Sequence, residues 1–125
     1  VFVSSLSLGR RKMEEIFEIE SYSNEFNDVL MAVSVQFLYD SSGICYEIVA
    51  PYGDNSPVKN ILTTKKNILN HVAYKVKNFD ETIAKYIELR CMPLGKIANA
   101  VAFNNARVIF FLTPMGMILE FIEDE

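Results

Sequence analysis

Short apolar runs alternate with polar turns along the chain, a pattern typical of strands joined by tight connections. Strands are predicted over residues 12–21, 32–40, 44–50, 68–76, 107–113 and 117–123, and residues 92–105 are predicted to hold a further strand and a long loop. The turns at 41–43 and 114–116 each end in a glycine and join their flanking strands. The pattern therefore predicts two hairpins, one in each half of the chain.

Two helices are predicted from their first residues. Ser56 and Pro57 suit the N-cap and the first helical position, and an apolar side follows them. Asn78, with Glu81 three residues later, predicts a capping box at the start of the second helix. Four apolar residues form one stripe of this helix: Phe79, Ile83, Tyr86 and Ile87.

Composition changes this picture mainly by exclusion. The chain has 125 residues, half of them hydrophobic and 22% charged, as expected for one globular domain. A net charge of -4 and a pI of about 5.0 argue against nucleic-acid binding, and Arg10-Arg11-Lys12 is too small a basic patch to change this. No apolar run reaches the roughly 18 residues of a membrane span. The cysteines, Cys45 and Cys91, form no CxxC pair and no disulfide framework, so we expect a cytoplasmic protein. Both are expected to be buried as small hydrophobic side chains.

One stretch of the chain repeats in its second half. The segments VQFLYDSSGICYEIV, from Val35, and VIFFLTPMGMILEFI, from Val108, align without gaps. The alignment matches Phe37 with Phe110, Gly43 with Gly116 and Glu47 with Glu120, at a constant offset of 73 in residue number (110−37, 116−43 and 120−47). Any two hairpins with a central glycine look alike. A glutamate at the same strand position in both argues further for two copies of one unit packed together.

Three polar side chains within apolar runs are candidates for a functional site. His71 is the only histidine and lies in the run ILNHVAYKV, while Glu47 and Glu120 lie in the last strand of each hairpin. A carboxylate between apolar neighbours must be paired, hydrogen-bonded, protonated or bound to metal, because bare burial is costly. Imidazole and carboxylates together suit zinc, nickel, cobalt, manganese or iron. From the residues alone, a core histidine with solvated glutamates stays the alternative.

Two nearby stretches carry a resemblance to a known family: YEIVAPYGDNSPVKNIL and LNHVAYKVKNFDETI. They are similar to the vicinal oxygen chelate superfamily, in particular to its methylmalonyl-CoA epimerase-like and glyoxalase I-like branch. The segment VIFFLTPMGMILEFIE resembles that branch's closing hairpin. The resemblance implies an α+β fold of paired βαβββ modules in a single domain, residues 1–125. Residues 1–64 would be the first module with its linking helix, and residues 65–125 the second.

The resemblance also implies the chemistry. Glu47, His71 and Glu120 match the family's metal ligands, with nickel, cobalt or zinc as the ion and Glu120 as the catalytic group that moves a proton. The enzyme would be a lyase or an isomerase, acting through an enediolate or enolate on a 2-oxo thiohemiacetal or an acyl-CoA. Glu25 is a weaker candidate for a second base, with a solvated loop acid as its alternative. Aromatic residues of the hairpins line either the cleft or the core: Phe37, Tyr39, Phe110 and Phe111.

The cues to the substrate disagree. Glu47 matches glyoxalase I, whereas epimerases often carry glutamine at that position. The loop at 53–57 and the short helix after it resemble the epimerase instead. Two alternatives from other classes stay open: a non-catalytic, drug-sequestering binding protein on the same fold, and an inactive partial domain. We expect a small-molecule substrate and a homodimer, because members of the family are commonly dimers.

The start of the chain does not match a complete first module. Periodicity leaves both a short strand and the end of a helix open for residues 1–8, and Gly9 is a common stop signal after a helix. In the second module, His71 precedes Leu89, near the end of the helix, by an offset of 18 in residue number (89−71). If Leu8 is the matching helix end, counting back 18 puts the position equivalent to His71 before the first residue. We therefore expect the first module to lack its opening strand and histidine, and the metal site to be incomplete and empty or partly occupied.

Overall fold

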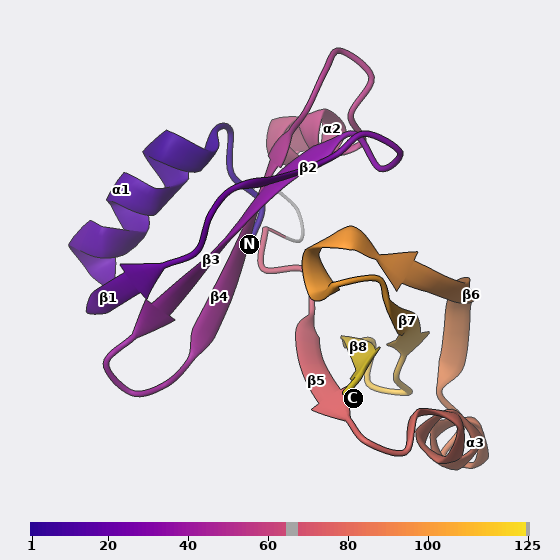
Figure 1. Ribbon diagram of the computed structural model, residues 1–125. Helices are drawn as coiled ribbons and strands as arrows, with labels where there is room; N and C mark the ends of the chain where they lie inside the picture. The colour runs from indigo at the N-terminus through magenta and orange to yellow at the C-terminus, as the bar shows by residue number, and fades with distance from the viewer. Residues whose placement is uncertain (65–67, 125) are drawn as a thin grey trace. The chain divides into compact units, whose positions relative to one another are not determined.

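The computed structural model describes residues 1–64 and 68–124, which form two compact units, Val1–Asn70 and His71–Glu125 (Figure 1). Each unit holds a four-stranded sheet with a helix packed on one face. The α+β class is confirmed. Residue 65, the predicted start of the second module, lies outside the described residues.

The first unit is built around its long central strand, β3. Its elements are α1 (Leu6–Ile16), β1 (Ile19–Tyr22), β2 (Phe26–Asp28), β3 (Val33–Asp40), β4 (Cys45–Pro51) and α2 (Val58–Thr64). β3 pairs antiparallel with β4 along one edge, and with β1 and β2 along the other. The predicted hairpin and the helix predicted after Ser56 are both confirmed. The core between α1 and the sheet consists of Leu6, Met13, Leu38, Ile48 and Ala50.

The second unit has a continuous sheet in the order β5-β8-β7-β6. Its elements are β5 (Val72–Val76), α3 (Phe79–Glu88), β6 (Met92–Ala100), a 3-10 turn (Val101–Phe103), β7 (Ala106–Leu112) and β8 (Ile118–Glu123). β5 runs parallel to β8, and the other neighbours are antiparallel. The core on the α3 side consists of Phe79, Cys91, Ile109, Phe111 and Phe121. Residues that alternate with these along β7 and β8 therefore point to the opposite face of the sheet.

The internal repeat is confirmed by the register of the strands. Phe37 lies opposite Glu47 in the first hairpin, and Phe110 lies opposite Glu120 in the second. The two hairpin turns also share a glycine with a positive φ: Gly43 at 92° and Gly116 at 84°. The two hairpins therefore carry the same residue type at three equivalent positions: the glycine of the turn, the phenylalanine and the candidate glutamate.

The first helix lies elsewhere than the sequence pattern predicted. α1 begins at Leu6, runs through Gly9 and continues to Ile16. The prediction that residues 1–8 are the tail of a helix was therefore wrong, and the strand predicted over 12–21 is confirmed only for residues 19–21, which belong to β1. Gly9 is not a stop signal here. A Cβ at this position would meet the Val3 side chain at 2.8 Å, so the glycine permits a close approach between helix and chain.

A single parallel bridge marks the place of an opening strand in the first unit. Phe2 forms a parallel bridge with Val49 of β4, and the flanking backbone hydrogen bonds are 2.9 Å long. In the second unit, Lys75 of β5 lies opposite Ile122 of β8, and both positions follow from the same offset of 73 (75−2 and 122−49). The described residues contain no strand before α1, as expected, and this single bridge stands in its place. The same offset puts the position equivalent to His71 ahead of the first residue.

Three smaller predictions also differ from the structure. The Asn78 side chain makes no cap hydrogen bond, so the predicted capping box does not form. The strand predicted over 68–76 begins at Val72, and its side chains are largely exposed because β5 is an edge strand of its sheet. Of the two cysteines expected to be buried, Cys91 is buried and Cys45 is exposed.

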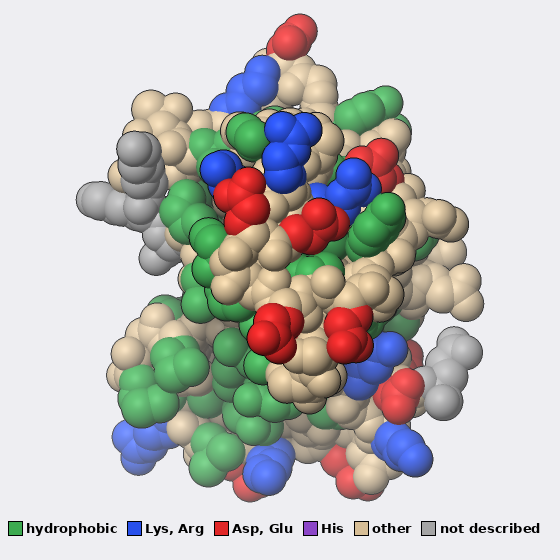
Figure 2. Space-filling model, turned by 90° about the vertical axis from the view of Figure 1, so that its left-hand side faces the viewer, with side chains coloured by type: hydrophobic (Ala, Val, Ile, Leu, Met, Phe, Trp, Pro, Cys, Tyr) green, Lys and Arg blue, Asp and Glu red, His purple; other side chains and the backbone are tan. Residues whose placement is uncertain are grey.

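Charges of both signs are interspersed on the face of the molecule drawn in Figure 2. On α1, Arg10 pairs with Glu14 at 3.7 Å and Lys12 pairs with Glu15 at 3.2 Å. The short basic segment therefore has carboxylates of its own helix beside it. Among the described residues, no helix combines the length and the apolar character needed to cross a bilayer.

Candidate functional site

Glu120 is a buried carboxylate on the face of its sheet that points away from α3. Its neighbours Leu119 and Phe121 pack on the α3 side, so alternation along β8 turns Glu120 to the other face. Only 4% of the residue is exposed. A carboxylate so deeply buried needs a hydrogen-bond or charge partner, because removing it from water alone is costly.

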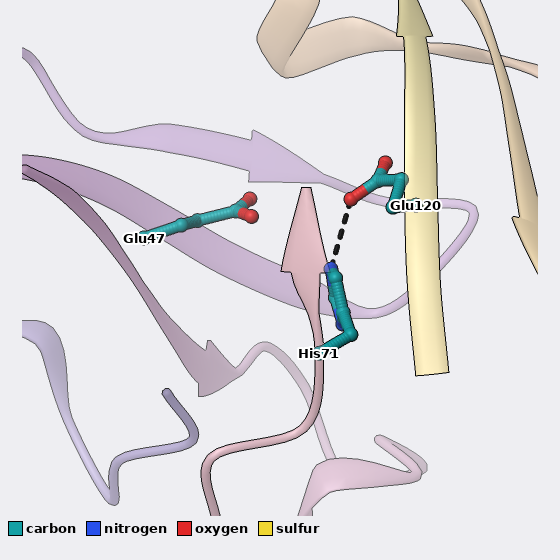
Figure 3. A group of neighbouring side chains, drawn as sticks. All are labelled: Glu47, His71 and Glu120. Atoms are coloured by element: carbon teal, nitrogen blue, oxygen red, sulfur yellow. Dashed lines mark hydrogen bonds and ion pairs between the residues drawn. The ribbon is translucent and has the colours of Figure 1, made fainter. Parts of the chain in front are cut away.

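His71 supplies a partner for this carboxylate. It directly precedes β5, whose Ala73 lies opposite Glu120 in the parallel pair of strands. The His71 Nε2 atom is 2.8 Å from Glu120 Oε2, and the histidine side chain is 19% exposed. Figure 3 shows the imidazole pointing at the carboxylate, with the contact drawn as a dashed line. The second unit alone thus brings two of the three predicted site residues together.

An aromatic ring adjoins this pair. The His71 and Phe110 ring centroids are 4.9 Å apart and their planes are nearly perpendicular, at 87°. Phe110 reaches the pair because it lies opposite Glu120 in the strand register. Phe111, grouped with Phe110 as a candidate for the cleft or the core, is fully buried in the α3-side core. Strict alternation along the strand was the signal that could have separated the two phenylalanines.

Glu47 belongs to the first unit and occupies the equivalent strand position there. Its neighbour Ile48 is buried against α1, so Glu47 points to the face of its sheet away from that helix. The residue is half-buried, and Figure 3 draws it extending from β4. Each unit therefore carries one glutamate, opposite one phenylalanine, on the sheet face that its helix does not cover, which we call the open face.

Tyr39 and Cys45 lie opposite each other on the same face of the first sheet as Glu47. Burial, followed by the charge and hydrogen bond of Cys45, raises the pKa of the Tyr39 hydroxyl above its ordinary value of 10.0. Tyr39 therefore keeps its proton at neutral pH. It can donate a hydrogen bond to a ligand on this face but cannot serve there as a base.

Glu25, the weaker candidate for a second base, lies on the opposite face of the first sheet. It is exposed and lines a cavity of about 280 Å³ beside the start of α1. The same cavity is lined by Ala50, which packs on the α1 side, whereas Glu47 faces away from α1. Glu25 therefore cannot act on the same face as Glu47, and its alternative as a solvated loop acid is the better description.

Comparison with known proteins identifies the fold. No family model and no curated protein matches the chain. The structure of a hypothetical protein, BH1468 from Bacillus halodurans C-125, is similar with a TM-score of 0.82 and 18% identity, over 99% of this chain and 89% of that one. Methylmalonyl-CoA epimerase from Mycobacterium tuberculosis matches with a TM-score of 0.76 and 16% identity, over 99% and 83%.

A second methylmalonyl-CoA epimerase structure matches with a TM-score of 0.77 and 15% identity, over 99% of this chain and 90% of that one. Identities this low establish the fold and leave the activity open. The chain has the vicinal oxygen chelate fold, which the resemblance of its sequence implied.

Proposed function

We propose that this protein is a metal-dependent lyase or isomerase that moves a proton at a carbon next to a carbonyl group. The observation that carries the proposal is the 2.8 Å contact between His71 and the buried Glu120, on the sheet face that α3 leaves open. A carboxylate held by an imidazole in a largely apolar setting is a suitable pair for binding a cation or moving a proton.

The donor chemistry of this pair fits a divalent ion. Neutral imidazole nitrogen and carboxylate oxygen are the ligands that zinc, nickel and cobalt accept in proteins. The two atoms that would bind lie side by side, one on β8 and one on the residue directly before the neighbouring strand β5, so the backbone of the second unit holds them in place. When bound, such an ion would supply Lewis acidity that stabilises negative charge developing on a substrate oxygen.

Glu47 is proposed as the third ligand on the strength of the internal repeat. It has the register position of Glu120, opposite a phenylalanine on the open face of its sheet. It is also half-buried among apolar strand residues, where a carboxylate benefits from a cation. Glu47 and His71 would hold the ion, while Glu120 would bind it and also take and return the substrate proton.

An acyl-CoA is the substrate class that we favour. The named epimerase structures match the whole chain, and methylmalonyl-CoA, the compound in their names, has an acidic carbon next to a thioester. The epimerase-like loop before α2 supports the same choice. Glu47 supports the alternative, a 2-oxo thiohemiacetal. Both substrates present the same chemistry, a proton that leaves a carbon beside a carbonyl group.

The test combines metal analysis with proton exchange. Chelator-treated protein is loaded with nickel, cobalt or zinc, and metal per chain is measured by elemental analysis. Exchange of the C2 proton of methylmalonyl-CoA in D₂O is followed by NMR, and conversion of a methylglyoxal–thiol adduct is followed by absorbance. We expect one ion per chain and exchange with one substrate, lost in Glu120→Gln and kept in Glu88→Gln, which alters an exposed acid at the end of α3.

The outcomes separate the alternatives. A protein that binds no ion after loading contradicts the metal proposal. A protein that binds the ion but exchanges neither substrate contradicts the enzyme proposal, whereas a metal-free protein that still binds apolar cations favours the sequestering alternative. The homodimer stays a prediction, and light scattering of the purified protein measures it directly.

A further inference from the structure

Phe110 contacts the only histidine of the chain. It lies on β7 opposite Glu120, and its ring centroid is 4.9 Å from the His71 centroid with the planes at 87°. This edge-to-face arrangement is the one that aromatic rings prefer. The imidazole therefore contacts side chains of both β7 and β8: the Phe110 ring, and the Glu120 carboxylate at Nε2.

His71 needs such support because of its place in the chain. It precedes β5, and β5 is an edge strand of the sheet. The hydrogen bond to Glu120 fixes the position of Nε2 but does not by itself set the tilt of the ring plane. A ring packed at right angles restricts this rotation, as groups around a metal ligand commonly do when they set its orientation.

The equivalent phenylalanine of the first unit also has an aromatic neighbour. Phe37 occupies the position equivalent to Phe110, opposite Glu47. Its ring lies 6.3 Å from that of Phe26, at 63°. A phenylalanine in this register therefore packs against another aromatic ring in both units.

We infer that Phe110 is a positioning residue that fixes the orientation of the His71 imidazole against Glu120, and through it sets the metal affinity of the site. The metal part of this inference rests on the proposed function, while the orientation of the imidazole does not.

The test uses the fact that His71 is the only histidine. Its ring signals in an NMR spectrum of histidine-labelled protein are therefore unambiguous. In metal-free Phe110→Leu we expect the His71 ring signals to broaden, because the imidazole then samples several orientations, whereas a shift alone reports only the lost ring current. We also expect the dissociation constant for zinc or cobalt to rise on the order of tenfold, the lower end of the effect of removing an orienting neighbour. Phe110→Tyr keeps the ring and should restore both.

Tyr74→Leu is the matched control. Tyr74 lies three residues after His71, on the α3 side of the sheet, where its ring is 6.3 Å from that of Phe121. Removing this ring should leave the His71 signals in place. Phe110→Met provides a second ring-free variant if Phe110→Leu unfolds.

Unchanged His71 line widths in a folded, ring-free variant overturn the inference. Wild-type protein that binds no metal contradicts the proposed function alone, because the signals of the metal-free protein still decide the role of Phe110.

Discussion

The two units share a backbone register but fill their cores with different side chains. Four core positions are aliphatic or thioether in the first unit and aromatic at the same offset of 73 in the second: Leu6, Met13, Leu38 and Ile48, against Phe79, Tyr86, Phe111 and Phe121. In the second core the Tyr86 and Phe121 rings are 4.6 Å apart, and the Phe111 and Phe121 rings 6.0 Å. Aromatic contacts of this kind add stability beyond the area they bury. The repeat therefore preserves which positions are buried rather than which residues fill them.

The two units differ more in the polar contacts between the helix and the sheet. In the second unit Arg107 donates hydrogen bonds to Glu123 at 2.7 and 2.9 Å and to Asp80 at 3.2 and 3.3 Å, and lies over the Phe79 ring at 4.7 Å. The equivalent positions of the first unit are Ser34, Ala50, Ser7 and Leu6, and all four line the cavity of about 280 Å³. The second unit thus has an arginine clamp, the contacts of Arg107 with Asp80, Glu123 and Phe79. In the first unit the equivalent side chains are small or aliphatic and surround a cavity.

Against these differences, the glutamate and its facing phenylalanine are the same in both units. Core residues can change as long as their neighbours change with them, and the clamp is partly exposed. A glutamate on an apolar strand face gains little for packing in either unit. Its presence at both positions is therefore better explained by the chemistry of the open face than by folding.

The largest expected effect concerns the two cores. Phe111→Ala should destabilise the protein by about 3–5 kcal/mol, because Phe111 is fully buried. Leu38→Ala, at the equivalent position, should cost about 2–5 kcal/mol and less than Phe111→Ala, because it removes a smaller side chain and no aromatic contact. Urea unfolding of both variants measures the difference. A larger loss for Leu38→Ala would show that the aromatic core is not the more tightly packed one.

Substitution of the two matched glutamates should impair different properties, the exchange rate for Glu120 and the metal affinity for Glu47. Glu120→Gln removes the proposed base, and we expect the proton-exchange rate to fall about 10²- to 10⁴-fold. Glu47→Gln removes only a proposed ligand, so the metal dissociation constant should rise at least roughly tenfold, with activity recovered at high metal concentration. Exchange assays across a metal titration distinguish the two variants. Equal, unrecoverable losses would contradict the separate roles.

The sequence predicted the features that depend on strand periodicity and on the repeat. Both hairpins, and the placing of Glu47 and Glu120 in equivalent register, follow from alternation and a constant offset. The start of the chain was missed because a glycine within a helix resembles a stop signal, and only the close approach of Val3 explains Gly9. The repeat offset, applied from Phe79 back to Leu6, would have located α1.

Contacts between side chains were harder to predict. The Phe110 ring beside His71 depends on how an edge strand sits against its neighbours, which no local pattern encodes. The Arg107 clamp joins residues from three elements, and single charges along a sequence do not reveal their partners. The side of the sheet on which Glu25 lies could have been inferred, because Phe26 next to it faces the other way.

A third prediction removes the clamp. Hydrogen bonds from Arg107 hold the pKa of Glu123 below its ordinary value of 4.5, against the opposite effect of burial. A carboxyl group with a lowered pKa stabilises the fold above its unfolded pKa, and this contribution disappears as the pH falls through the folded pKa. Arg107→Met should therefore reduce stability at neutral pH, by less than Phe111→Ala, and flatten the loss of stability on acidification below about pH 4.5.

Thermal unfolding across this pH range measures the effect. Lys96→Met, which removes an exposed cation from β6 of the same unit, is the control and should leave the pH dependence unchanged. If wild type and Arg107→Met lose stability in parallel on acidification, the ion pair contributes nothing to folding.

The smallest effect should come from rebuilding the clamp in the first unit. The triple variant Ser34→Arg, Ser7→Asp and Ala50→Glu places the three charged residues at the matching positions around the cavity. Leu6 would lie where Phe79 supports Arg107 in the second unit, so the aliphatic stem of the new arginine could pack there without a cation–π contact. Because the site is open to solvent, we expect a gain of only about 0–1 kcal/mol.

Ser34→Met separates the two contributions of the new arginine, since it fills the cavity without a charge. If the triple variant is more stable than Ser34→Met at low salt and the advantage shrinks at high salt, the ion pairs form as they do in the second unit. If the triple variant is the less stable of the two under both conditions, burial of the glutamate at position 50 outweighs the pairing. The two units would then differ in the geometry of this corner as well as in its residues, and the small side chains of the first unit would be a consequence of its backbone.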